Sequence, residues 1–75
     1  MTTLDTVPTG GVCKVSAHRS DGILHRRFLD LGIICGTEIR TLFKSPHGDP
    51  KAYLIRGAVI ALRNADASKI AVEII

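Results

Sequence analysis

Residues 21–44, DGILHRRFLDLGIICGTEIRTLFK, contain a change of hydrophobic period that separates a helix from a strand. Leu24, Phe28 and Leu31 stand at positions i, i+4 and i+7, so they fall on one side of a helix. Gly32 follows directly, at the position where many helices end in a residue with positive φ. The spacing therefore predicts one short helix over residues 22–31.

Beyond a connector at residues 33–36, the period of the sequence falls to two. Ile39, Thr41 and Phe43 alternate along residues 37–44 with side chains that suit the opposite face. This alternation is typical of a strand with one buried side. We expect a strand over residues 37–44, with Ile39, Thr41 and Phe43 on one face.

The same pattern continues on both sides of this central stretch. Residues 11–19 form a first expected strand, and later strands are expected at residues 52–56, 59–63 and 70–75. The side chains expected inward on the first and last strands are Cys13, Val15, Ala17, Ile70, Val72 and Ile74. Residues 45–50 are dense in turn formers and predict a hairpin loop, and Asn64 is the expected N-cap of a helical turn.

These elements predict a mainly β fold. About five short strands in so small a chain would curl into a small barrel, because closure removes exposed sheet edges. One short helix follows the first strand, and a helical turn precedes the last. The 75 residues are enough for a single domain, which we place at residues 1–75.

Length and composition also limit the function. A chain of 75 residues is too short to enclose a large substrate cavity, and it has no phosphate-binding loop or nucleophile motif, so we expect a binding module and not an enzyme. The net charge of +3 is spread along the chain, which argues against nucleic-acid binding. The N-terminus lacks a signal-peptide pattern, and no run approaches the ~20 apolar residues of a membrane span. We therefore expect a soluble, cytoplasmic protein that does not insert into the membrane.

Possible metal ligands are present without a diagnostic spacing. The candidates are Cys13, His18, His25, Cys35, His47 and Asp49. No two of these residues have the spacing of a C-x-x-C motif or of two histidines one helical turn apart. We expect Cys13 in the core, His18 pointing away from it and all three histidines in solvent. No cofactor is expected, although an Fe(II) site stays open because ligands can converge in space.

Leu29 is the most informative residue of the predicted helix. It lies about 140° around the helix axis from Leu24, beside His25 and Arg26. Two alternatives follow. The side chain tucks under the connector at residues 33–34, or it stays exposed and forms a docking patch with Arg26 and Ile34.

Three segments together resemble the FeoA family of small bacterial proteins connected with ferrous iron uptake. They are HRRFLDLGIICGTEI (residues 25–39), SPHGDPKAYLIRG (residues 45–57) and VIALRNADASKIAVEI (residues 59–74). The shared pattern is an arginine-rich helix, a leucine-aspartate-hydrophobic-glycine stretch, a small-proline-x-glycine-aspartate-proline hairpin and an I-A-L-R strand. Cys35 departs from this pattern, since the family commonly has proline before Gly36.

The resemblance implies an SH3-like barrel and an accessory role. An FeoA-like chain would be a cytosolic adaptor that binds the membrane ferrous iron transporter FeoB and modulates Fe(II) uptake, reaching the inner face of the membrane through that partner. The contact residues that we expect are Arg26, Leu29 and Ile34 near the helix, with His47 and Asp49 in the hairpin loop.

An alternative role also follows from the resemblance. Similar barrels form the terminal domain of iron-dependent repressors, so the chain could be a metal-responsive regulatory domain. This alternative requires ligands such as His18, His47 or Asp49 to meet in space.

Overall fold

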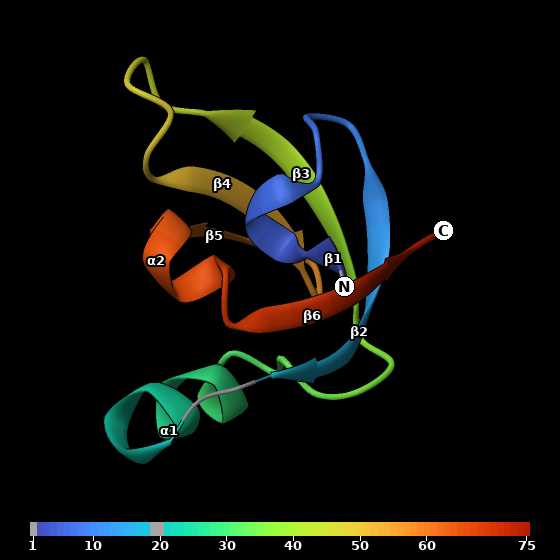
Figure 1. The fold of residues 1–75 in the computed structure, drawn as a ribbon, viewed down its shortest axis with the longest axis vertical. Coiled ribbons are helices and arrows are strands. Elements are labelled where there is room, and N and C mark those ends of the chain that lie inside the picture. The colour runs from blue at the N-terminus through green and yellow to red at the C-terminus, as the bar shows by residue number, and fades with distance from the viewer. Residues whose placement is uncertain (1, 19–20) are drawn as a thin grey trace.

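The computed structural model describes residues 2–18 and 21–75. Figure 1 shows these residues folded as a curled sheet with short helical segments. In chain order the elements are β1 (Thr2–Thr3), the 3-10 helix η1 (Leu4–Thr6), β2 (Val12–His18), α1 (Gly22–Asp30), β3 (Glu38–Lys44), β4 (Lys51–Ile55), β5 (Ala58–Leu62), α2 (Asn64–Ala67) and β6 (Ile70–Ile74). The mainly β fold is confirmed. β1 was not predicted because two residues show no periodicity, and residue 19 of the first expected strand lies outside the described residues.

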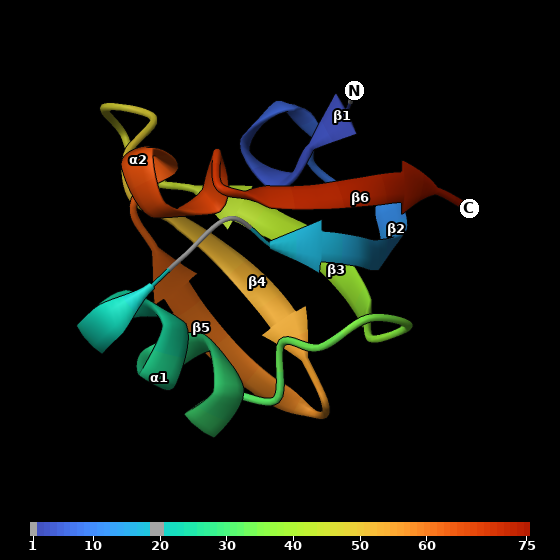
Figure 2. The ribbon, with the colours of Figure 1, turned by 60° about the horizontal axis from the view of Figure 1, so that its bottom comes forward.

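The strands form one antiparallel sheet in the order β1–β6–β2–β3–β4–β5. β1 and β5 are its two edges. The chain passes from β5 to β6 through α2, which contacts η1, so helical segments connect the two edges. Figure 2 shows α1 at the end of the molecule opposite the β3–β4 hairpin loop. This arrangement places the two predicted contact regions, the helix and the loop, far from each other.

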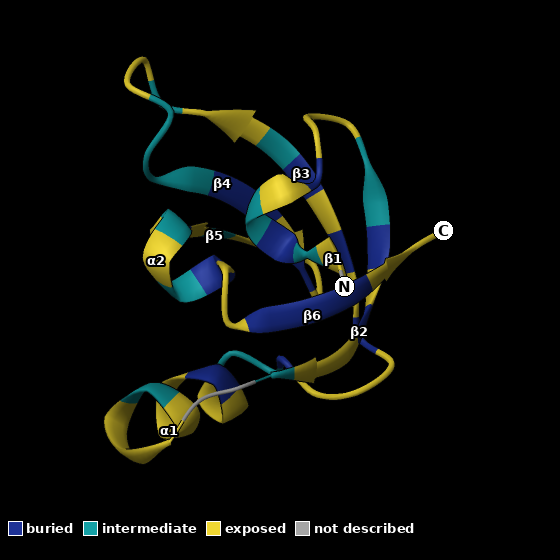
Figure 3. Ribbon diagram, viewed as in Figure 1, coloured by how far each residue is buried: buried dark blue, intermediate teal, exposed yellow. Residues whose placement is uncertain are grey.

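The core lies inside the curled sheet, and Figure 3 shows buried stretches in several of its strands. Phe28 of α1 and Tyr53 of β4 are its largest fully buried side chains. Leu4 and Val7, at and just after η1, are also buried. Burial of such a side chain contributes roughly 1.5–3 kcal/mol, so residues 4–7 are a structural part of the barrel, which the sequence pattern did not predict.

Two β-bulges change the face on which side chains emerge. The register of β2 against β6 shifts between Val15 and Ala17, and that of β3 against β4 shifts between Thr41 and Phe43. One inserted residue turns the following side chains to the other face. The expectation that Ala17 faces the core was therefore wrong, and Phe43, expected on the same face as the buried Ile39 and Thr41, is 59% exposed. Ile74, also expected inward, is 57% exposed and lies past the end of the β1–β6 pairing.

The helical turn before β6 has a cap different from the one expected. Arg63, not Asn64, is the N-cap residue of α2, and Asn64 is its first helical residue. The backbone N–H of Asn64 donates to Oδ1 of Asp49 at 2.8 Å, and its side-chain Nδ2 donates to the carbonyl of Gly48 at 3.1 Å. The β3–β4 hairpin loop therefore supplies the acceptor that a local N-cap side chain would otherwise provide.

No helix among the described residues is long and apolar enough to cross a membrane.

Candidate docking surface

A groove lies between α1, the connector that follows it, and β5. Its volume is about 510 Å³. Three of its lining residues are Asp30, Gly32 and Arg56. The other six are apolar: Leu29, Leu31, Ile34, Ile55, Ala58 and Ile60. Sequence analysis did not predict a contribution from β4 and β5, because these strands meet the connector only in the folded chain.

The connector is positioned by the way α1 ends. Gly32 (φ +80°) donates its N–H to the carbonyl of Leu29 at 3.0 Å, and Ile33 donates to the carbonyl of Phe28 at 2.9 Å. These two bonds form a Schellman motif, and Phe28 and Ile33 are both buried in the hydrophobic core. The predicted stop at Gly32 is confirmed, although α1 itself ends at Asp30 and Leu31 is its C-cap.

The hydroxyl of Thr37 stabilises the connector through two hydrogen bonds. It donates to the carbonyl of Gly32 at 2.9 Å and accepts from the N–H of Ile34 at 3.3 Å. The N–H of Thr37 also donates to the carbonyl of Ile34 at 3.0 Å. With the backbone fixed in this way, Ile33 is fully buried while Ile34 stays 47% exposed. The connector thus presents one apolar side chain outward on a rigid base.

Leu29 is 46% exposed on the same groove. Of the two alternatives for this side chain, exposure beside Ile34 is therefore the one that the structure supports. Leu24 and Leu31 are partly buried and pack against the core with Phe28, as the stripe predicted. The helix consequently has one apolar face on the core and a second apolar position at the groove.

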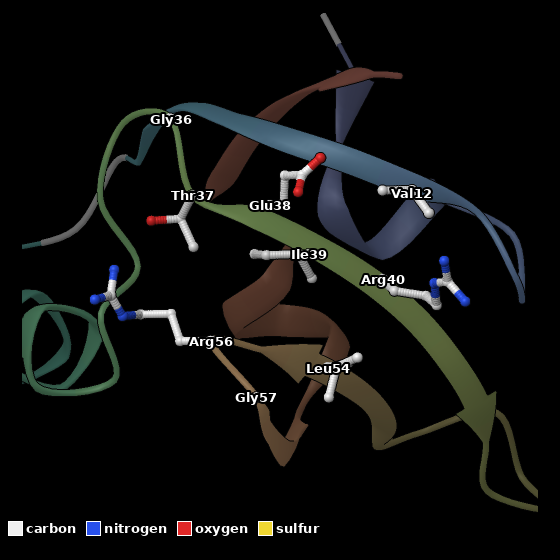
Figure 4. A pocket seen from close by; sticks show the side chains of 9 residues that line it. All are labelled: Val12, Gly36, Thr37, Glu38, Ile39, Arg40, Leu54, Arg56 and Gly57. Atoms are coloured by element: carbon white, nitrogen blue, oxygen red, sulfur yellow. The ribbon is translucent and has the colours of Figure 1, made fainter.

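Arg56 separates this groove from a second hollow. Arg56 (φ +52°) and Gly57 (φ +82°) form the β4–β5 turn, and positive φ at two successive residues is typical of a type I′ hairpin turn. Figure 4 shows the Arg56 side chain reaching toward α1. Its aliphatic stem lies directly over Gly32, where a Cβ atom would overlap Cδ of Arg56. Arg56 lines both hollows.

The second hollow lies on the outer face of β2, β3 and β4 (Figure 4). Its volume is about 610 Å³, and its side chains include Val12, Glu38, Arg40 and Leu54. Val12, Arg40 and Leu54 form one row across the sheet, because each is paired with the next in register.

The structure divides the five predicted contact residues between two places. Leu29 and Ile34 meet at the groove, while Arg26 is exposed on the same helix but does not line it. His47 is exposed in the hairpin loop at the opposite end, and Asp49 there is half-buried and bonded to α2. Asp49 thus has a structural role that the sequence did not suggest.

The buried ionisable groups belong to the core. Cys13 is fully buried, its Sγ donates to the carbonyl of Ile39 at 3.5 Å, and burial raises the pKa of its thiol. Burial, followed by the negative charges of Asp5, Cys13 and Asp49, raises the pKa of Tyr53 to about 12. Both groups stay protonated near neutral pH, which is consistent with packing and not with nucleophilic chemistry.

Of the three histidines, His25 and His47 are exposed as expected, and His18 is not. His18 was expected to point away from the core into solvent, yet it is half-buried and its ring contacts those of Phe28 and His25. The bulge in β2 accounts for this, because it reverses the alternation just before His18. Among the described residues, no group of three His, Cys, Asp or Glu side chains that could hold a metal gathers.

Comparison with known proteins identifies the family. The FeoA domain model matches residues 2–74. This chain belongs to the FeoA domain family. A protein of Porphyromonas gingivalis, described as an Fe(2+) transport protein A/Fe(2+) transporter FeoB fusion protein, is 32% identical to this FeoA domain over 72 residues. The match covers 96% of this chain and 8% of the fusion protein.

Solved structures share the FeoA fold. The FeoA-like protein of Clostridium acetobutylicum superposes with a TM-score of 0.87 at 36% identity, covering 99% of this chain and 90% of that one. FeoA of Stenotrophomonas maltophilia, described as a prokaryotic SH3 domain protein and crystallised with zinc, gives a TM-score of 0.86 at 26% identity, covering 97% and 91%. The SH3-like fold is thereby confirmed. A manganese-dependent transcriptional repressor gives a TM-score of 0.88 at 22% identity over 97% of this chain and 40% of the repressor, a likeness of fold alone.

Proposed function

We propose that this FeoA domain is a cytoplasmic accessory that docks on FeoB and modulates Fe(II) uptake. The observation that carries the proposal is the fusion protein of P. gingivalis, in which a domain 32% identical to this chain is covalently joined to FeoB. A covalent fusion keeps two domains at a high effective concentration, which is useful when they act together. A FeoA domain that is not joined to FeoB would need a docking surface to reach the same arrangement.

The groove between α1 and β5 is the surface that fits this role. Leu29 and Ile34 are each about half exposed, so they can still bury apolar area against a partner. The connector beneath Ile34 is held by three hydrogen bonds involving Thr37, so little ordering is required on binding. A rigid base with exposed apolar side chains is typical of the anchor positions of an interface.

The charges around the groove indicate the partner's chemistry. His25, Arg26 and Arg27 are exposed on α1, and Arg56 forms one wall of the groove. Asp30 is the acidic group of the lining. The surroundings are therefore mainly basic, and the complementary partner is an apolar segment of FeoB flanked by acidic residues.

Direct binding to detergent-solubilised FeoB from the same organism tests this function. Leu29→Asp and Ile34→Asp should each weaken binding by tenfold or more, on the order of the loss of an interface anchor. Ile23→Asp is the matched control, because Ile23 lies on the same helix and is 90% exposed, so it receives the same new charge away from the groove.

The outcomes separate function from site. Saturable binding that Leu29→Asp and Ile34→Asp weaken, and Ile23→Asp does not, supports both. Saturable binding that ignores all three variants keeps the function and moves the contact elsewhere, with the hairpin loop at His47 next to be tested. Absence of binding, with or without guanine nucleotide, contradicts the adaptor function.

A further inference from the structure

Two of the three histidines lie side by side where β2 meets α1. The ring centroids of His18 and His25 are 5.2 Å apart, and the ring planes are tilted by 47°. The edge of one ring also meets Phe28, with 5.5 Å between the centroids of His18 and Phe28 and 80° between their planes. The two histidines are seven residues apart and belong to different elements, so their proximity could not be predicted from the spacing in the sequence.

Backbone structure places both residues at this junction. The bulge in β2 brings His18 toward α1, where the fully buried Phe28 supports its ring. His25 stands in the first turns of α1, and its N–H donates to the carbonyl of Asp21 at 3.3 Å. His18 is half-buried and His25 is exposed, so the space between them can be reached from solvent.

The distance between the rings matches that of two imidazoles on one tetrahedral ion. With a zinc–nitrogen bond of about 2.0–2.1 Å and a ring radius of about 1.1 Å, the ion lies roughly 3.2 Å from each ring centroid. A tetrahedral angle then places the two centroids about 5.2 Å apart. The observed separation is 5.2 Å. A bound ion lies in the plane of each ligating ring, and rings tilted by 47° are compatible with that requirement, whereas parallel stacked rings are not.

We propose that His18 and His25 together bind a divalent transition metal of the zinc class. Each imidazole offers two ring nitrogens, so one can ligate the ion while the other keeps a hydrogen bond, as metal-bound histidines usually do. Water completes the coordination, because no third His, Cys, Asp or Glu side chain joins the pair among the described residues. Such a half-open site binds less tightly than a closed four-ligand site.

The donor set also sets the preference among metals. Affinity for nitrogen sites rises from Fe²⁺ through Ni²⁺ to Cu²⁺, and Zn²⁺ also binds more tightly than Fe²⁺. The pair therefore discriminates against Fe²⁺, the ion that FeoB would carry, and is not a sensor of that cargo. This inference stands independently of docking on FeoB, because it needs only the chain alone.

Zinc titration of the intact chain, followed by NMR of the imidazole rings, tests the site. All proteins carry Cys35→Ser, since the exposed thiol of Cys35 would otherwise compete for zinc. His18→Gln and His25→Gln should each weaken Zn²⁺ binding by roughly tenfold or more, because each removes one of two ligands. His47→Gln, in the distant hairpin loop, is the matched control and should leave the affinity unchanged. Fe²⁺, added without oxygen, should bind more weakly than Zn²⁺.

NMR spectra of the metal-free variants show whether a substitution disturbs the fold itself. If His18→Gln disturbs the packing on Phe28, the exposed His25 carries the test alone, because its substitution leaves the core intact. Saturable one-to-one shifts at both rings, lost in His25→Gln and kept in His47→Gln, support the site. Absence of saturable shifts, or equal zinc binding by His25→Gln and the parent protein, overturns it and leaves the His18–Phe28 contact as core packing only.

Discussion

At the level of single residues, Gly32 meets two separate requirements. Its φ of +80° lies in the region that favours glycine, and its missing Cβ leaves room for the stem of Arg56. Gly57 has nearly the same φ, +82°, but nothing lies within 4 Å of the place where its Cβ would be. The two glycines therefore share the backbone requirement and differ in the steric one.

Alanine substitutions should separate these requirements. Gly57→Ala should lower the free energy of unfolding by about 1–2 kcal/mol through backbone strain, and Gly32→Ala should cost clearly more because Arg56 must move. In the background Arg56→Ala, the extra cost at Gly32 should largely disappear, which a double-mutant cycle from urea unfolding would measure. Equal costs for the two glycines in the parent protein would contradict the packing of Arg56 on Gly32.

Tyr53 should make the folding stability fall as the pH rises in the alkaline range. Its pKa is raised from the ordinary value of 10 to about 12, mainly by burial and then by nearby negative charge. Above pH 10 the unfolded chain loses this proton while the folded chain keeps it, so the unfolded state binds fewer protons and folding stability falls. The loss should be roughly 1.4 kcal/mol per pH unit between about pH 10 and 12 and should be absent below that window.

The chain contains a single tyrosine, so tyrosinate absorbance reports on Tyr53 alone. The folded protein should titrate with a midpoint near 12. Tyr53→Phe should lack this component of the alkaline loss, which separates it from the titration of lysines. A folded-state midpoint near 10 would show that the hydroxyl reaches solvent.

At the level of elements, α2 depends on a loop that is distant in sequence. The helix has only four residues, and the carboxylate of Asp49 accepts the N–H of Asn64 at its start. Asp49→Ala should lower the free energy of unfolding by about 0.5–2 kcal/mol, the usual cost of losing an N-cap acceptor. Asp49→Asn should cost less because an amide oxygen still accepts.

His47→Ala serves as the control for this substitution, since His47 is an exposed residue of the same loop. It should change stability by less than about 0.5 kcal/mol. Urea unfolding followed by circular dichroism gives both values. Equal effects at the two positions would mean that the Asp49–Asn64 bond does not stabilise α2.

The elements also show how far sequence reasoning reaches. Periodicity predicted α1, its end at Gly32, the strand before it and the four longer strands after it, because these depend on local spacing. It failed at Phe43 and His18, because a bulge forms in response to the partner strand and leaves no local pattern. The residues missed at the groove, Arg56 and Ile60, come from a hairpin that reaches α1 only through the tertiary fold.

For the whole molecule, the distribution of charge bears on association. The net charge is +3, and the groove has exposed basic residues of α1 beside it. If FeoB presents an acidic apolar segment, Arg26→Glu should slow association roughly three- to tenfold at low salt and change dissociation little, because charges near an interface mainly steer encounter. Added salt should reduce the difference.

Lys69→Glu is the control at this scale. It makes the same change in net charge, but Lys69 lies between α2 and β6, away from the groove. Stopped-flow or surface-based kinetics with solubilised FeoB would give both rates. Equal slowing by the two variants would indicate an effect of net charge alone and would remove Arg26 from the docking surface.

The bond between the hairpin loop and α2 has a consequence for protein engineering. Exposed hairpin loops are common choices for inserting epitopes or fluorescent labels. In this chain an insertion next to Gly48 or Asp49 would pull two acceptors away from Asn64 at once. Ala67, the fully buried residue of α2, would then be free to leave the core. A tag placed there would report on a damaged barrel, so experiments on partner binding need their labels elsewhere.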